Sequence, residues 1–281
     1  MSWARKLKDR LFSALASLVA LAFAAVALHV VLYVTWRGLP VLASEGLSLL
    51  FEKPAAVTAE RPGGVAPALV GTLYLTASSL AIAAPMAALA AVFSVEFPRS
   101  PLSRLVRLTS RALLEVPTIS VGLLVFSLLV LPLGRFTGLA GTVALALVML
   151  PYVYVYAESA LSSVPSTYIE AGYALGMRRA QVALGLRLKM AKRGVWRGVL
   201  MATMKAMGET APLLFTVYGA RAVVFGGPLQ PIDALPLMIF QFIQSGYENW
   251  RALAWGGAFV LLVLYMAMYA AYRLALRGET K

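Results

Sequence analysis

The sequence predicts an all-α, polytopic membrane protein with six transmembrane helices and both termini in the cytoplasm. Of its 281 residues, 60% are hydrophobic, which lies well outside the composition of soluble domains. Long stretches carry no charge, and each is long enough to cross a bilayer as a helix. Most of the 25 basic residues fall in alternate segments between these stretches, and cytoplasmic segments are the ones enriched in lysine and arginine. The composition therefore predicts the class, and the basic residues predict the orientation.

The formal net charge of +13 also occurs in nucleic-acid-binding proteins. Here the basic residues follow the pattern of membrane topology, so we expect a lipid bilayer and no nucleic acid as the partner. The chain contains no cysteine, which excludes disulfides, thiolate catalysis and cysteine-based metal sites. We expect no metal site.

The first span is predicted at 11–34, after a segment with four basic residues. A cleaved signal peptide has a similar start but a shorter apolar core, so we interpret the segment as a retained anchor. It contains His29, the only histidine, which we expect to be a packed or interfacial residue because no second histidine or carboxylate lies at helical spacing.

The other spans are predicted at 69–95, 112–133, 139–157, 194–219 and 252–272. The chain is thus divided into residues 1–68 (cytoplasmic N-terminus, first span and external loop), residues 69–273 (the core transmembrane domain) and a cytoplasmic tail at 274–281. An apolar piece at 237–243 is too short to span. It is either a re-entrant or surface helix that closes the outer mouth, or a hydrophobic plug. Glu115 follows Arg111 at helical spacing, so we expect an interfacial ion pair there rather than a transport role.

Lys205 and Glu209 lie inside the predicted fifth span, four residues apart. If the inner boundary is near Gly194, the helical rise puts them roughly 16 Å and 22 Å into a hydrocarbon layer about 30 Å thick. Ionisable groups at that depth mark transport pathways by default, although the pair also fits a pin between neighbouring helices. Pro212 lacks an amide hydrogen and Gly208 loosens the backbone, so we expect a kinked helix at this point.

The same span carries small residues every four positions, which lets a second helix approach closely. They are Gly194, Gly198, Ala202 and Ala206.

The longest internal loop, 158–193, is predicted to contain a short helix at 168–176 that ends at a glycine suited to a C-cap. Ile169, Tyr173 and Leu175 form an apolar strip on it. Such a helix either lies on anionic lipid or docks in a groove of a soluble partner, and the residues alone leave both open. The chain has no glycine-rich Walker sequence, so any energy from ATP comes from another subunit. It also shows no catalytic pair, and we expect no enzyme activity.

This loop resembles the cytoplasmic Glu-Ala-Ala-x-x-x-Gly signature of the integral-membrane permeases of ABC importers. The matching positions are Glu170, Ala171, Gly172 and Gly176, continued by Leu186 and Leu188. Gly172 departs from the alanine of that pattern, and Lys189 departs from its proline. The resemblance implies a type I importer permease fold and docking of this loop to an ATPase.

Within that family, the segment Gly208-Glu209-Thr210-Ala211-Pro212-Leu213-Leu214 resembles the PstA type of phosphate importer permease. The resemblance implies a translocation path that includes Lys205, Gly208, Glu209, Thr210 and Pro212. It also implies a PstC-like permease partner, a dimeric ABC ATPase that binds ATP and magnesium, and an external phosphate-binding protein. Lys205 departs from the arginine more usual in the family, and lysine lacks the planar two-pronged donor that suits phosphate.

Two alternatives stay open. The first is an importer permease of the same architecture for sulfate, phosphonate or another small solute. The second is an ion-driven carrier that works alone, for which the loop at 158–193 has no binding role.

Overall fold

The computed structural model describes residues 3–277, and within this range the chain is built from helices with two isolated β-bridges. The predicted all-α class is therefore confirmed. Four of the described helices are long and apolar enough to cross a membrane, or five if one strongly bent pair counts as a single span. The four are α1 (Trp3–Glu45), α3 (Ala66–Glu96), α7 (Gly138–Ser162) and α12 (Glu248–Arg277). Residues 278–281, half of the predicted tail at 274–281, lie outside the described residues.

The prediction of a continuous third span is wrong, because this part of the chain is a broken helix. α4 (Pro101–Glu115) is followed by α5 (Thr118–Val125), η1 (Phe126–Val130) and α6 (Leu131–Leu133). The axis turns by 107° at the break. Val116 is extended, with φ −71° and ψ 125°, because Pro117 disfavours the helical conformation of the residue before it. In the described structure no ion pair joins Arg111 to Glu115, and both side chains are exposed.

The predicted fifth span, 194–219, is interrupted where a kink was expected from Gly208 and Pro212, and the interruption is a full break between two helices. A π-helical segment, η2 (Gln181–Arg187), leads into α9 (Leu188–Met207), which ends well before the predicted boundary. The chain then turns and forms the short helix α10 (Ala211–Leu214). Apolar sequence lies on both sides of this charged segment, so hydropathy alone does not mark the end of the helix.

The core of the molecule is a bundle of α3, α7 and α9, which pack along one another. Their contact is rich in buried alanines, and two glycines of α9 touch α7 directly. A Cβ built on Gly194 meets the Ala160 Cβ at 2.3 Å, and one built on Gly198 meets the Tyr156 Cβ at 2.6 Å. The close approach predicted from the spacing of small residues is confirmed.

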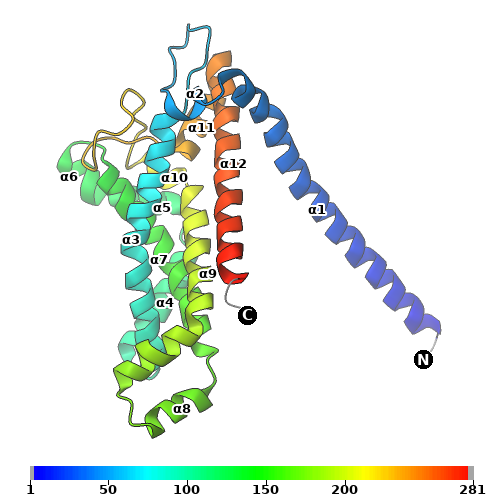
Figure 1. Ribbon diagram of the computed structural model, residues 1–281, viewed down its shortest axis with the longest axis vertical. Coiled ribbons are helices and arrows are strands. Elements are labelled where there is room, and N and C mark those ends of the chain that lie inside the picture. Colours follow the sequence, from blue (N-terminus) through cyan, green and yellow to red (C-terminus); the bar gives the residue numbers. More distant parts are fainter. Residues whose placement is uncertain (1–2, 278–281) are drawn as a thin grey trace.

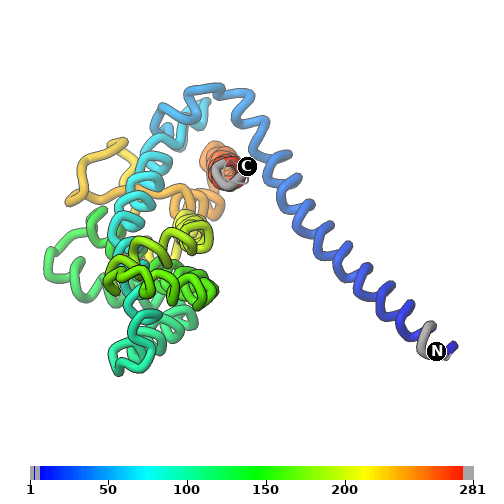
Figure 2. Tube along the Cα trace, turned by 60° about the horizontal axis from the view of Figure 1, so that its bottom comes forward, coloured from blue at the N-terminus to red at the C-terminus, as the bar shows by residue number. Residues whose placement is uncertain are grey.

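The helix α1 leaves the bundle at a steep angle (Figures 1 and 2). None of its most apolar window is buried within the chain. It runs on past the predicted end of the first span and through Pro40, and only its C-terminal part packs on α12. There Gly38 brings the two backbones together, because a Cβ at this position lies 2.6 Å from the carbonyl oxygen of Trp255.

Two short helices form a buried layer at the end of the bundle opposite α8 (Figure 1). The short helix α2 (Ser48–Phe51) packs on α3, and α11 (Leu235–Ile243) packs on α12 and α3. Leu235, Leu237, Met238 and Phe242 are fully buried, which favours the hydrophobic plug among the two predicted roles of this apolar piece. The Leu235 amide donates to the Thr72 hydroxyl oxygen at 2.8 Å and so fixes α11 on α3.

Candidate translocation site and coupling helix

The segment predicted to line the path is the break between α9 and α10. The Gly208 amide donates to the Lys205 carbonyl at 3.2 Å, which is the tighter three-residue bond of a helix end. Glu209 and Thr210 lie outside both helices, and Pro212 stands in the first turn of α10, where its missing amide hydrogen costs nothing. The proline therefore begins a new helix instead of kinking a continuous one.

Lys205 and Glu209 form an ion pair across this break, with 2.5 Å between the lysine Nζ and the glutamate Oε1. The glutamate side chain is 6% exposed and the lysine side chain 42% exposed in the single chain. A buried carboxylate is stable only when a cation or hydrogen-bond donors compensate it. The lysine therefore neutralises the glutamate from one side while its own other side stays open.

Tyr265 of α12 closes the opposite side of the break, and it is a residue that the sequence analysis missed. Its hydroxyl donates to the Met204 carbonyl at 3.0 Å. A Cβ built on Gly208 lies 2.5 Å from the same hydroxyl oxygen, so only glycine fits there without displacing the tyrosine. The predicted span carries three tyrosines, and no local pattern singles out Tyr265, because its partner lies far away in the chain.

Pro212 and Thr210 contact different neighbours. A Cβ built on Gly122 of α5 lies 2.6 Å from the Pro212 Cα, so α5 and α10 cross at backbone contact. Thr210 and Tyr265 line a groove of about 520 Å³ with apolar residues of α1, α11 and α12. The five residues predicted for the path thus lie together at one helix break, but they face more than one side of it.

The predicted cytoplasmic helix is present as α8 (Ser166–Ala174), at one end of the bundle (Figure 1). It begins after Pro165 and ends in a Schellman motif. The Gly176 amide donates to the Tyr173 carbonyl at 2.9 Å, and the Met177 amide donates to the Gly172 carbonyl at 3.1 Å. Gly176 has φ +77°, a conformation that glycine adopts without strain. The C-cap predicted from this glycine is confirmed.

The residues of the signature divide between two faces of α8. Glu170 and Ala171 are exposed, whereas Gly172 is buried. A Cβ built on Gly172 lies 3.1 Å from the end of the Leu186 side chain, which belongs to η2. Leu188 is half-buried and packs on the core of the bundle. The inner face of α8 is therefore packed against η2, the segment that leads into α9, and its outer face is exposed.

The outer face of this helix is partly apolar. Leu175 is 83% exposed, and Tyr168 and Tyr173 are also exposed, while Ile169 of the predicted strip is buried in the chain itself. Exposed apolar side chains beside a carboxylate are typical of a surface that binds a protein groove.

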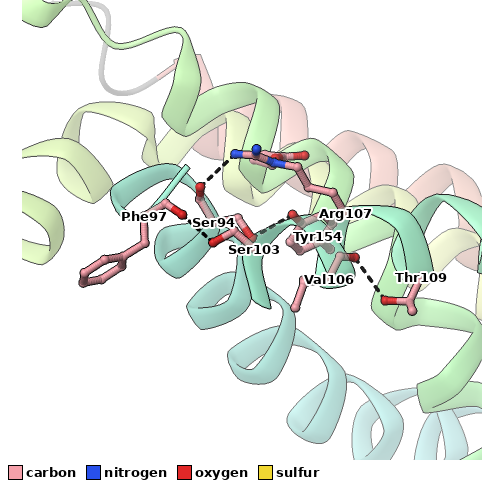
Figure 3. A network of polar contacts seen from close by, with 8 residues as sticks. Ser94, Phe97, Ser103, Val106, Arg107, Thr109 and Tyr154 are labelled. Atoms are coloured by element: carbon pink, nitrogen blue, oxygen red, sulfur yellow. Dashed lines mark hydrogen bonds and ion pairs between the residues drawn. The ribbon is translucent and has the colours of Figure 1, made fainter. Parts of the chain in front are cut away.

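A polar network joins α3, α4 and α7 at the same end of the bundle (Figure 3). Arg107 of α4 pairs with Glu158 of α7 at 2.5 Å and donates to the Ser94 carbonyl at 2.8 Å. The Tyr154 hydroxyl donates to the Ser94 hydroxyl oxygen at 2.9 Å, and Ser103 donates to the Phe97 carbonyl at 2.7 Å. Sequence analysis missed this network, since its members come from three separate helices.

A bundle of apolar helices with an ion pair at a helix break and an exposed helix at one end defines a membrane transport subunit. Residues 83–279 match the family described as binding-protein-dependent transport system inner membrane component. The chain belongs to this family. The resemblance to importer permeases predicted from the sequence is thereby confirmed.

Several relatives support the assignment. The Probable phosphate transport system permease protein PstA of Methanocaldococcus jannaschii is 40% identical over 277 residues, which cover 99% of this chain and 96% of that protein. The phosphate transport system permease protein PstA of Haemophilus influenzae is 34% identical over 83% of this chain and 80% of its own length.

A crystal structure of the MetNI methionine ABC transporter, in an inward-facing conformation, has the same fold. It matches 76% of this chain and 97% of the solved chain, with a TM-score of 0.62 at 17% identity. At this identity the likeness shows the fold alone, and it confirms the predicted importer permease fold.

Proposed function

We propose that this chain is the transmembrane permease subunit of an ATP-driven phosphate importer and forms one half of its translocation path. The observation that carries the proposal is the ion pair of Lys205 and Glu209 at a helix break, in a chain whose relatives are named phosphate permeases. Irregular backbone inside a membrane is tolerated only where protein buries it or where it lines a wet cavity. Broken helices of this kind form the binding sites of many transporters.

The two charges have different tasks in this proposal. The open side of Lys205 gives phosphate a transient positive contact. Glu209 lowers the net charge of the site, so that the anion is not held too tightly to leave, since conduction needs weak binding. Gly208, Thr210 and Pro212 keep the backbone broken at this depth, which provides polar groups beside the ion.

The proposed partners follow from the family and the exposed surfaces. A PstC-like permease supplies the other half of the path and covers the exposed side of Lys205. A dimeric ABC ATPase, which binds ATP and magnesium, receives α8 through Glu170 and Ala171, while Gly172, Gly176, Leu186 and Leu188 hold that helix in place. An external phosphate-binding protein meets the segment 220–250. Both termini then lie in the cytoplasm of a cell whose membrane the chain crosses several times.

The decisive experiment starts with purification of the tagged chain in mild detergent, to ask whether a second permease and an ATPase accompany it. The complex is then placed in liposomes with the binding protein, and uptake of labelled phosphate is measured with and without ATP. We expect uptake only with ATP, and competition by unlabelled phosphate at concentrations where sulfate and phosphonate have no effect.

Each other outcome contradicts a defined part of the proposal. Preferential competition by sulfate or phosphonate contradicts phosphate as the substrate. Uptake by the chain alone without ATP contradicts the importer mechanism and supports an ion-driven carrier.

A further inference from the structure

Glu96 is the last residue of α3 and carries a buried carboxylate that the proposed function does not use. Its side chain is 6% exposed, although it lies at the cytoplasmic end of the bundle, where water is close. A carboxylate in such a position destabilises the fold strongly unless it is paired. The structure therefore has to compensate this charge, and the identity of the compensating groups is informative.

Both compensating groups come from the segment that follows α8. The Arg187 Nε lies 2.9 Å from one carboxylate oxygen of Glu96, and the Arg179 Nε lies 3.5 Å from the other. The Arg179 guanidinium also donates to the backbone carbonyl of Glu96 and lies over the Phe97 ring, 4.0 Å from its centroid. Two cations at a helix C-terminus also interact favourably with its dipole.

Arg187 connects this carboxylate to α8 through a short path. It is the last residue of η2, whose Leu186 packs against Gly172 of α8. Its guanidinium also donates to the Leu161 carbonyl of α7 at 3.5 Å. A displacement of α8 thus reaches Arg187 through one packed contact.

The two neighbouring spans are connected to α8 in different ways. α9 follows η2 directly in the chain, so it moves with η2. α3 has no such covalent connection, and the arginines on Glu96 are its charged contacts with the loop after α8. If the contact between Glu96 and the arginines is broken, α9 can move without moving α3 by the same amount.

We propose that Glu96 is a positioning residue for energy coupling, which ties the loop after α8 to α3 so that α3 and α9 respond together to the ATPase. The inference rests on the proposed function, because it assumes that α8 docks to an ATPase. It differs from a simple stabilising role, since it predicts a loss of transport per ATP in complexes that still assemble and still hydrolyse ATP.

The test uses the complete transporter in liposomes and measures phosphate uptake and ATP hydrolysis in the same sample. Glu96→Gln keeps the size of the side chain and removes its charge. We expect ATP hydrolysis to continue while the phosphate moved per ATP falls about fivefold or more, the low end of a typical coupling between sites.

Arg187→Gln should have the same effect. The double variant should be no worse than either single one, because both changes break one interaction. Glu96→Asp, which keeps the charge, should recover part of the ratio.

Glu158→Gln is the matched control. It removes a carboxylate that is also shielded at this end of the bundle, but its partner Arg107 belongs to α4 and not to the loop after α8. We expect its phosphate-to-ATP ratio to match the unmodified transporter.

The proposal is overturned if Glu96→Gln assembles and keeps the normal ratio, or if Glu158→Gln lowers the ratio equally. It is also overturned if Glu96→Gln, Arg187→Gln and Arg179→Gln all fail to assemble, since the contact is then structural. If the unmodified transporter moves no phosphate with ATP, the proposed function itself is wrong, and this outcome is distinct from a normal ratio in the variants.

Discussion

Lys205 and Glu209 show how the local surroundings decide what a pair of opposite charges can do. Their i, i+4 spacing would place them on one helix face, yet the helix ends between them and only the glutamate is buried. In the single chain the lysine is exposed, which leaves it able to contact an ion or a partner subunit.

Lys205→Ala should therefore abolish most transport without preventing assembly. We expect phosphate uptake in liposomes to fall about tenfold or more, equivalent to ~1.4 kcal/mol of lost stabilisation of the ion in the path. Lys205→Arg is the matched control, because it keeps the charge and provides a planar donor. Normal uptake by Lys205→Ala, with normal ATP hydrolysis, would show that this residue does not contact the ion.

Gly208→Ala should destabilise the protein, because the added Cβ lies 2.5 Å from the Tyr265 hydroxyl oxygen. We expect a loss of about 1–3 kcal/mol, which is typical of an overpacked site. Thermal unfolding in detergent measures it. Gly185→Ala is the control, since nothing lies within 4 Å of a Cβ there. Adding Tyr265→Phe to Gly208→Ala should restore part of the stability, and an unchanged midpoint in the single variant would contradict the predicted clash.

At the scale of the elements, α8 depends on a backbone conformation that few residues tolerate. Gly176→Ala puts a side chain at φ +77°, which costs about 1–2 kcal/mol in the left-handed region. We expect the helix end to loosen and less ATPase to copurify with the chain. Gly46→Ala is the matched control, because Gly46 has φ +61° and nothing within 4 Å, but lies far from α8 in the sequence. Equal loss of ATPase from both variants would contradict a specific role of this cap.

The buried layer around α11 contains a group that responds to pH. Burial raises the pKa of Asp233 from 3.8 to about 6, although Arg221 and the Ala234 amide act in the opposite direction. Between these two values the folded chain holds a proton that the unfolded chain has released, so stability falls as the pH rises through this window. A shift of about 2 pKa units corresponds to roughly 3 kcal/mol.

Asp233→Asn should remove this pH dependence, because the amide does not titrate. Its oxygen still accepts the 2.9 Å hydrogen bond from the Ala234 amide. Unfolding midpoints in detergent are compared at pH 4.5 and pH 7. We expect the variant to gain stability relative to the unmodified chain as the pH rises. A constant difference between the two proteins would show that the carboxyl titrates normally.

The same scale shows what hydropathy can predict. The spans α3 and α7 follow from uncharged runs between charged loops, and α8 follows from Pro165 and Gly176 at its two ends. The exact ends of α4 and α9 do not follow from hydropathy, but each break has a local signal in the sequence. Pro117 marks the first break, and Gly208 with Pro212 marks the second. Tyr265 and the partners of Glu96 depend on contacts between distant segments, which no local pattern encodes.

At the scale of the whole molecule, the breaks determine how the chain crosses the membrane. The bent pair of α4 with α5 to α6 connects α3 to α7. The starts of α3 and α7 lie together, because Gly71 and Gly138 both lie against Ile232. The bent pair therefore brings the chain back along the bundle, and α8 lies at the opposite end from Arg135. Which of these two ends faces the cytoplasm decides whether an ATPase can reach α8.

The absence of cysteine makes this question directly testable, since each introduced thiol is the only one in the chain. Three exposed positions are replaced one at a time in intact cells: Glu60→Cys, Arg135→Cys and Ser166→Cys. A maleimide that does not cross membranes should label the first two from outside, because they lie in the segments predicted to be external. Ser166→Cys, at the start of α8, should be labelled only after the membrane is permeabilised. Labelling of Ser166→Cys in intact cells, with Arg135→Cys protected, would reverse α7 and exclude docking of α8 to a cytoplasmic ATPase.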